Sequence, residues 1–347
     1  MNIRKLEQSE HGKTRILWEE IFFEDTKEFL DYYYSVKIRE NRIYVAEDED
    51  GIHAMLHLNP YTIMVNGREC KSNYIVAVAT QEKYRHQGLM SRLLQIALKE
   101  MYEERIAFTF LMPAAEAIYR PFDFRFIYEQ KVGYIKGSKK QLGEHILIEE
   151  MQAKDAQEVA KFVQDYLRER YGVFAKRDVS YYQMALEEQK AQNGGICILR
   201  DGGKIRGCVF FAREVECELR EPVFEKGYEA YLGEMTERIA KDRTCKVLAW
   251  ENERAKEKRP IIMARIVHME AFLELFDITE DCEQEFYIED PILEANNGFY
   301  RIEKSKKVHV ERCAKPEDGK RIMKVADALR LFEENEKVNR IFLNEIV

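Results

Sequence analysis

The residues best suited to chemistry form a short polar loop, residues 81–88, between an apolar run and an amphipathic run. The first turn of a helix exposes unpaired N–H groups, and its macrodipole adds about half a positive charge, so the backbone alone can bind a pyrophosphate. Gly88 lets this backbone approach an anion closely because glycine has no side chain. Lys83, Arg85, His86 and Arg92 add positive potential around it. The loop is therefore predicted to bind a diphosphate group.

The elements on both sides of the loop are those that this role requires. Residues 74–80 form an apolar run typical of a buried central strand. From Gly88 onward, apolar residues recur at helical spacing and polar residues occupy the opposite face, which predicts a surface helix packed on a sheet. Residues 107–112 then form a short apolar strand, and a short helix is predicted around residues 115–119.

Other kinds of site are disfavoured. The seven cysteines contain no C-x-x-C pair and the seven histidines no H-E-x-x-H, so we expect neither a disulfide framework nor a metal. A net charge of −8 argues against nucleic acid as the main partner. With no run of about 18 apolar residues and no signal-like N-terminus, we expect a cytoplasmic protein without a membrane partner.

The 347 residues suffice for two or three domains. In the first, a helix over residues 13–38 precedes strands around residues 42–47 and 52–58, joined by an Asp-Gly turn. A helix over residues 155–170 and a hairpin closed by Asp201-Gly202-Gly203 repeat this order, but without an R-x-x-G loop. We therefore predict an internal duplication whose second copy has lost the cofactor site.

Several segments resemble the enhanced intracellular survival (Eis) type of GNAT-superfamily N-acetyltransferases. Arg85 and Gly88 match the superfamily pattern R/Q-x-x-G-x-G/A, whereas Met90 replaces its last small residue. The subfamily resemblance lies in VAVAT (residues 76–80), RHQGLM (85–90), IYRPFDF (118–124), MARIV (263–267), DPI (290–292) with Asn297-Gly298, and the tail FLNEIV (342–347). It covers the whole chain.

This resemblance implies an α+β fold. Tandem GNAT folds, each with a mixed central sheet flanked by helices, would be followed by a sterol-carrier-protein-like α+β domain. The implied boundaries are residues 1–137 for the acetyltransferase domain, 138–258 for a degenerate GNAT-like domain, and 259–347 for the third domain. Family members form closed rings, so a homo-oligomer is expected.

The resemblance also implies the reaction and its cofactor. Acetyl would pass from acetyl-CoA directly to a primary amine of a small polycationic molecule or a lysine side chain. The residues expected to bind the cofactor lie on the strand, in the loop and after the next strand: Val76, Val78, Arg85, His86, Gln87, Gly88, Leu89, Met90 and Ala115.

Two catalytic roles are implied. Tyr119 would be the general acid, because a phenol with a pKa of about 10 stays protonated and can donate to a departing thiolate. The C-terminal carboxylate of Val347 would be the base for an amine with a pKa of about 10.4. Alternatively, both residues have only structural roles: Tyr119 packs on the sheet, and the C-terminal tail adds a strand to a sheet. Asp123 stands where the family commonly has glycine.

The sequence indicates little about which substrate is recognised. Acidic residues such as Asp25 and Glu345 would favour a polycationic amine. An alternative function is a binding protein whose third domain holds an apolar ligand while the GNAT core is vestigial. The intact Arg85, Gly88 and Tyr119 argue against this alternative.

Overall fold

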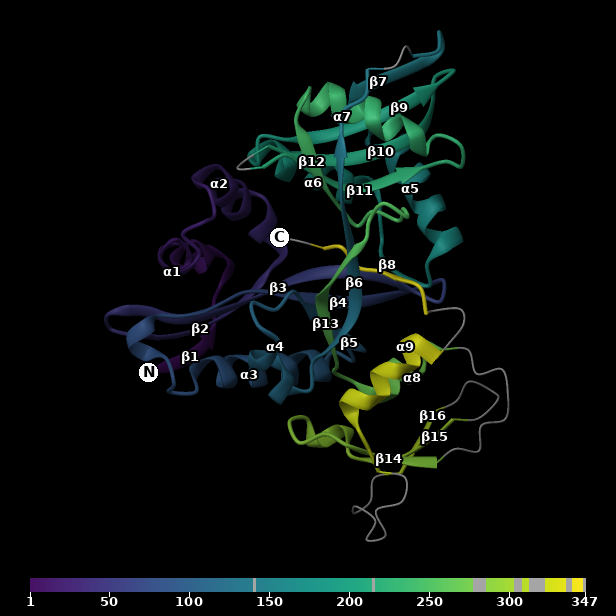
Figure 1. Cartoon of the computed structure of the whole chain (residues 1–347). Coiled ribbons are helices and arrows are strands. Elements are labelled where there is room, and N and C mark those ends of the chain that lie inside the picture. Colours follow the sequence, from purple (N-terminus) through teal and green to yellow (C-terminus); the bar gives the residue numbers. More distant parts are fainter. Residues whose placement is uncertain are drawn as a thin grey trace.

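The structure is a computed structural model that describes residues 1–139, 142–213, 216–276, 285–302, 308–311, 322–334 and 339–345. One large mixed sheet runs through the molecule, and a smaller sheet lies at one end of it (Figure 1). Helices flank the large sheet, so the fold is α+β.

The N-terminal region has the strand and helix order predicted around the loop. Its strands are β1 (Asn2–Lys5), β2 (Arg42–Asp48), β3 (Gly51–Val65), β4 (Arg68–Thr80), β5 (Phe108–Leu111) and β6 (Arg125–Lys136). Its helices are α1 (Arg15–Ile21), α2 (Lys27–Ser35), α3 (Leu89–Glu103) and α4 (Glu116–Tyr119), with short 3-10 turns η1 (Gln8–Thr14), η2 (Lys37–Glu40), η3 (Glu82–Tyr84) and η4 (Arg120–Phe122).

Two details of this region differ from the sequence prediction. The single helix expected over residues 13–38 is broken, because the Thr26 side chain accepts a hydrogen bond from the Phe29 N–H and starts α2 anew. The strand predicted over residues 52–58 continues through Pro60 to Val65. Proline is tolerated there because Pro60 lies in a gap along this edge of β3. Strand β2 pairs with β3 only as far as Leu58, and β8 pairs with β3 only from Ile63 onward.

The second region follows a similar order. It comprises β7 (Ile146–Glu150), η5 (Ala153–Asp155), α5 (Ala156–Arg170), β8 (Val173–Ala175), α6 (Val179–Ala191), β9 (Gly195–Asp201), β10 (Lys204–Ala212), β11 (Glu218–Phe224), η6 (Glu229–Tyr231), α7 (Leu232–Ala240) and β12 (Thr244–Leu248). The hairpin predicted around Asp201-Gly202-Gly203 is confirmed by the pairing of β9 with β10.

Both regions carry the same irregularity in the strand that precedes their main helix. In β4 the register with β3 shifts by one residue, and Ala77 there has a left-handed φ of 51°. In β11 the register with β10 shifts in the same way, and Glu221 has a φ of 52°. Such a bulge bends a strand away from its neighbour.

The two regions exchange strands within the large sheet. Among the described residues, this sheet has fourteen strands. Twelve follow the order β1-β2-β3-β4-β5-β13-β6-β12-β11-β10-β9-β7, while β8 pairs with β3 and β18 pairs with β8. Strand β13 (Glu257–Ile266) therefore lies between β5 and β6, while the second half of β6 pairs with β12. The boundary predicted between residues 258 and 259 falls inside β13.

The C-terminal region adds a small sheet and a tail. Its elements are α8 (Met269–Leu273), β14 (Glu285–Glu289), η7 (Glu294–Asn296), β15 (Gly298–Ile302), β16 (Val308–Glu311), β17 (Ile322–Lys324), η8 (Val325–Arg330), α9 (Leu331–Glu334) and β18 (Ile341–Phe342). Strand β18 returns to the large sheet beside β8 (Figure 1). One apolar core joins all three regions, since it contains Ile63, Phe108, Val173, Ile262 and Phe332.

Candidate functional site

An opening between β4 and β5 is the first component of the site. The two parallel strands are paired only at Tyr74 and Phe110. Beyond this pair β4 stays with β3, whereas β5 pairs with β13. The edge of β4 that carries Val76 and Val78 therefore faces the opening rather than another described strand.

The predicted anion-binding loop lies at the end of this opening. His86 and Gly88 both have left-handed backbone angles, with φ of 61° and 74°, and Gly88 is the residue before α3. A Cβ at position 88 would meet no atom within 4 Å, so the backbone angle rather than space requires glycine. The first turn of α3 has no acidic residue and no described side-chain cap. Its N–H groups can therefore bind an anion.

A histidine beneath the loop fixes its position. His53 is buried, and its Nε2 lies 2.6 Å from Asp48 Oδ1 while its Nδ1 lies 2.8 Å from Gln81 Oε1. Its ring stacks on Tyr84 at 4.0 Å. The hydrogen bond from His53 lowers the pKa of the Asp48 carboxyl. Gln81 in turn donates to Glu20 at 2.7 Å. The start of the loop is thus tied to the β2–β3 hairpin and to α1.

Tyr119 lies on the opposite side of the opening, at the end of α4. Its ring is buried, 5.8 Å from that of Phe124, and belongs to the same apolar cluster as Leu89 at the start of α3. Burial raises the pKa of Tyr119 to about 12. The hydroxyl is therefore a neutral hydrogen-bond donor at physiological pH. Ala115, which precedes α4, is exposed beside it.

A buried arginine of β13 holds the segment that follows Tyr119. Arg265 Nε donates to the carbonyl of Phe122 at 2.9 Å, and its Nη2 lies 2.7 Å from Asp290 Oδ1. Both charged residues are fully buried. The C-terminal region thus contributes directly to the position of the Tyr119 segment.

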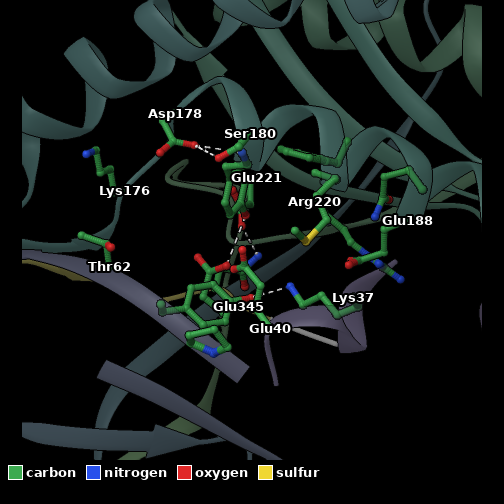
Figure 2. A pocket seen from close by; sticks show the side chains of 18 residues that line it. Lys37, Glu40, Thr62, Lys176, Asp178, Ser180, Glu188, Arg220, Glu221 and Glu345 are labelled. Carbon is green, nitrogen blue, oxygen red and sulfur yellow. Dashed lines mark hydrogen bonds between the residues drawn. The ribbon is translucent and has the colours of Figure 1, made fainter. Parts of the chain in front are cut away.

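An acidic cavity of about 230 Å³ is lined by residues of β3, α6 and the C-terminal segment (Figure 2). It is bounded by η2, β3, α6, β10, β11 and the C-terminal segment. Its walls are formed by Lys37, Glu40, Pro60, Tyr61, Thr62, Lys176, Asp178, Ser180, Tyr181, Met184, Ala185, Glu188, Gln189, Phe210, Arg220, Glu221, Asn344 and Glu345.

Two carboxylates of this cavity share one arginine. Arg177 Nη2 lies 3.1 Å from Glu221 Oε2 and 2.9 Å from Glu345 Oε1, and all three side chains are buried. Asn344 donates to Glu221 at 3.0 Å, and Tyr181 donates to Glu345 at 3.2 Å. Burial raises the pKa of Glu221. With both carboxylates ionised, this group carries one net negative charge.

A third carboxylate, Glu188, faces the cavity from α6. It accepts a hydrogen bond from the Tyr32 hydroxyl at 3.1 Å, and burial raises its pKa. Lys37 points into the same space, where its Nζ donates to the Tyr61 hydroxyl at 3.2 Å (Figure 2). Arg220 is already paired with Glu218 at 3.0 Å. The cavity therefore offers a surplus of negative charge to a ligand.

Aromatic rings connect the cavity to the opening. Tyr61 lines the cavity, and its ring centroid lies 6.2 Å from that of Tyr74 and 5.8 Å from that of Phe110. Tyr74 and Phe110 are the pair at which β4 and β5 diverge. Tyr61 therefore connects the wall of the cavity to the strand pair at which the opening begins.

The N-terminal part of this site matches a known domain. The family model of the acetyltransferase (GNAT) domain matches residues 2–127. These residues include the loop, both strands of the opening and Tyr119, so the part of the chain that carries the site is similar to a GNAT domain. No curated protein matches the chain.

Solved structures resemble nearly the whole chain. A probable N-acyltransferase from Enterococcus faecalis V583 has a TM-score of 0.79 at 16% identity, covering 100% of this chain and 99% of its own. A GCN5-related N-acetyltransferase from Anabaena variabilis has a TM-score of 0.75 at 16% identity, covering 96% and 90%. Eis1 from Mycobacterium abscessus has a TM-score of 0.65 at 13% identity, covering 94% and 88%. At these identities the likeness concerns the fold.

The GNAT domain contains all nine residues predicted to bind the cofactor. Val76 and Val78 lie at the β4 edge, residues 85–90 form the loop and the start of α3, and Ala115 lies across the opening. Tyr119 lies on the same side as Ala115. Val347, the predicted base, lies outside the described residues.

The two acidic residues expected to favour a polycationic amine lie in different places. Glu345 lines the cavity, but Asp25 accepts a hydrogen bond from Trp18 Nε1 at 2.7 Å and does not line it. Sequence reasoning missed Arg177, Glu188 and Glu221. A signal was available for Glu221, because the charged pair Arg220-Glu221 stands between the apolar Leu219 and the apolar end of β11 at Val223 and Phe224.

Within the described residues, no group of three or more His, Cys, Asp or Glu side chains is arranged to hold a metal. In the same part of the chain, no helix combines the length and apolar character needed to cross a membrane.

Proposed function

We propose that this protein is an N-acetyltransferase that moves the acetyl group of acetyl-CoA to a primary amine bound in the acidic cavity. The observation that supports this most directly is the layout of the GNAT domain. The loop at the start of α3 lies at one end of the opening between β4 and β5, and the acidic cavity adjoins the other end through Tyr61.

Each part of the cofactor has a counterpart among the described residues. The diphosphate would bind the N–H groups at the start of α3, with Arg85 beside it. The pantetheine arm would lie along the β4 edge at Val76 and Val78, extending the sheet through backbone hydrogen bonds. The thioester would then reach Ala115 and Tyr119. In the structure of N-myristoyltransferase from Saccharomyces cerevisiae, which resembles this chain with a TM-score of 0.54, a myristoyl-CoA is bound.

The reaction needs a neutral amine and a protonated leaving group. An alkyl amine with a pKa of about 10.4 is deprotonated at pH 7 at a cost of about 5 kcal/mol. We assign this proton to the carboxylate of Val347, since the described tail reaches the cavity at Asn344 and Glu345. The amine nitrogen attacks the thioester carbon, and the carbon–sulfur bond breaks. Tyr119 donates its proton to the departing sulfur, because burial keeps its hydroxyl neutral. The newly acylated nitrogen loses its remaining excess proton to the Tyr119 phenolate, so that the amide, the CoA thiol and the neutral tyrosine result and one proton stays with Val347.

The acceptor would be polycationic. The ammonium groups not being acetylated would lie against Glu188, Glu221 and Glu345, whose surplus charge needs neutralising in a buried space. A lysine side chain of a peptide is the other acceptor of this chemical class, and the open rim of the cavity allows it to enter.

We also infer that the second region is a degenerate GNAT-like unit in an Eis-like arrangement, with a sterol-carrier-protein-like third domain. The matching bulges at Ala77 and Glu221 support the duplication. In the second unit the bulged strand β11 is paired with β12, so its edge is not free, and the residue at the bulge is the buried Glu221. A cytoplasmic homo-oligomer remains part of this proposal.

A turnover assay tests the function. The release of CoA thiol from acetyl-CoA is followed with polyamines, aminoglycosides and lysine peptides, using a variant with an extended C-terminus as a probe of Val347. We expect turnover with at least one polyamine or aminoglycoside and a large loss in the extended variant. No turnover with any amine would overturn the proposal, and unchanged activity of the extended variant would overturn the role of Val347.

A further inference from the structure

Two cysteines of the second region lie opposite each other at the start of neighbouring parallel strands. Cys217 directly precedes β11 and Cys245 lies in β12, where Glu218 pairs with Lys246. The Lys246 N–H donates to the Cys217 carbonyl at 3.0 Å, so the ladder includes both cysteines. Paired strands lie about 4.7–4.9 Å apart. This separation falls within the Cα range of about 4.4–6.8 Å that a disulfide requires.

The two thiols already interact. The Cys245 thiol donates a hydrogen bond to Cys217 Sγ at 2.7 Å. This hydrogen bond lowers the pKa of Cys217, and the positive charges of Arg243 and Arg213 lower it further. The same hydrogen bond raises the pKa of Cys245. Cys217 is thus the better thiolate of the pair, and it retains a small exposure of 6%, whereas Cys245 has none.

The other described cysteines lack these features. Burial raises the pKa of Cys70 to about 11, and burial is the largest cause that raises the pKa of Cys197 to about 12. Cys208 is also buried, and its pKa is raised for the same reason. None of these three has a described sulfur neighbour within hydrogen-bonding distance, so they serve as internal references.

We propose that Cys217 and Cys245 are a modification site that forms a reversible disulfide with a low-molecular-weight disulfide as the oxidant. The Cys217 thiolate attacks one sulfur of the oxidant, forming a mixed disulfide and releasing one thiolate. Cys245 then loses its proton and attacks Cys217 Sγ, which forms the protein disulfide and releases the second thiolate. The two protons end on the two released thiols, and the two electrons reduce the oxidant.

The disulfide would tie β11 to β12 where these strands begin. Arg220 and Glu221 follow within four residues on β11 and line the acidic cavity. The cross-link would also close the chain around α7. The oxidised protein should therefore unfold at a higher urea concentration than the reduced protein, because the cross-link restricts the unfolded chain.

The experiment uses the reduced, full-length protein and oxidised glutathione. After incubation under native conditions, the remaining thiols are alkylated in denaturant and the digest is analysed by mass spectrometry. We expect a peptide pair linked through Cys217 and Cys245, its loss on treatment with dithiothreitol, and alkylated Cys70, Cys197 and Cys208. The urea midpoint should rise only in the linked protein.

Two variants separate this result from general thiol reactivity. Cys217→Ser should leave Cys245 alkylated and the urea midpoint unchanged by the oxidant. Cys197→Ser, which removes another buried thiol, should form the disulfide as the wild type does. The proposal would be overturned if Cys217 and Cys245 stayed fully alkylated in the folded wild type, or if they joined other cysteines instead of each other.

Discussion

Tyr119 is buried and Glu188 is half-buried, and the loss of solvent around each group raises its pKa. The consequences differ because the two residues need different protonation states. Tyr119 is useful as a neutral donor, so burial assists it. Glu188 is useful as an anion, so burial opposes it and lowers the stability of the folded protein when the carboxylate is ionised.

Tyr119→Phe should lower kcat about 100-fold or more, since a positioned general acid contributes about 10²–10⁴-fold. The KM for acetyl-CoA and the melting temperature should change little, because the ring remains packed against Phe124. Steady-state kinetics gives kcat and KM, and thermal unfolding gives the melting temperature. Tyr182→Phe is the matched control, as it removes another buried hydroxyl, one without a described partner. Equal kcat values in the two variants would remove Tyr119 from the mechanism.

Glu188→Gln should raise the free energy of unfolding by about 1 kcal/mol at pH 7 and weaken polyamine binding about tenfold. The folded-state pKa of Glu188 is raised above its ordinary value of 4.5. Below the ordinary pKa the carboxyl is protonated in both states, and the wild type loses stability as the pH rises through the folded-state pKa. Urea unfolding at several pH values should therefore show a difference that grows with pH. A difference that shrinks with pH would refute this sign.

At the scale of elements, the strand, loop and helix around Gly88 could be predicted from the sequence because their signals are local. The apolar run, the polar loop and the helical periodicity all lie within residues 74–103. The acidic cavity could not be predicted in this way. Glu188, Glu221 and Glu345 come from a helix, a strand and the tail, and only the folded chain brings them together. The break in the helix at Thr26 could not be predicted in this way either. Apolar residues recur at helical spacing on both sides of Thr26, and the break depends on one side-chain hydrogen bond.

Gly88→Ala should destabilise the fold by about 1 kcal/mol and weaken acetyl-CoA binding about fivefold or more, since alanine disfavours the left-handed backbone at the start of α3. Gly202→Ala is a close control, because Gly202 also has a positive φ, of 55°, and open space around its Cα. It should lose similar stability without weaker binding. Urea unfolding and calorimetry measure the two quantities. Equal binding in both variants would contradict the role of the loop.

At the scale of the whole molecule, the exchange of β6 and β13 makes the regions depend on one another. β13 lies between β5 and β6, and its Arg265 holds the carbonyl of Phe122. The boundary that the family resemblance implies at residue 259 therefore falls inside a strand that belongs to the continuous large sheet.

A fragment of residues 1–137 should not fold by itself, because it leaves β5 and β6 without the strand between them and opens the shared core. Circular dichroism and urea unfolding should show no cooperative transition for the fragment and a cooperative one for the full chain. A soluble fragment with cooperative unfolding would show that β13 is dispensable.

Binding of acetyl-CoA to the folded full-length protein, measured by isothermal titration calorimetry, tests the central claim most directly. We expect saturable binding with a Kd of about 1–100 μM, in the range of typical enzyme KM values. It should weaken with added salt because the loop binds the diphosphate partly through charge. No saturable binding by a protein that circular dichroism shows to be folded would contradict the claim that the start of α3 is a coenzyme A site.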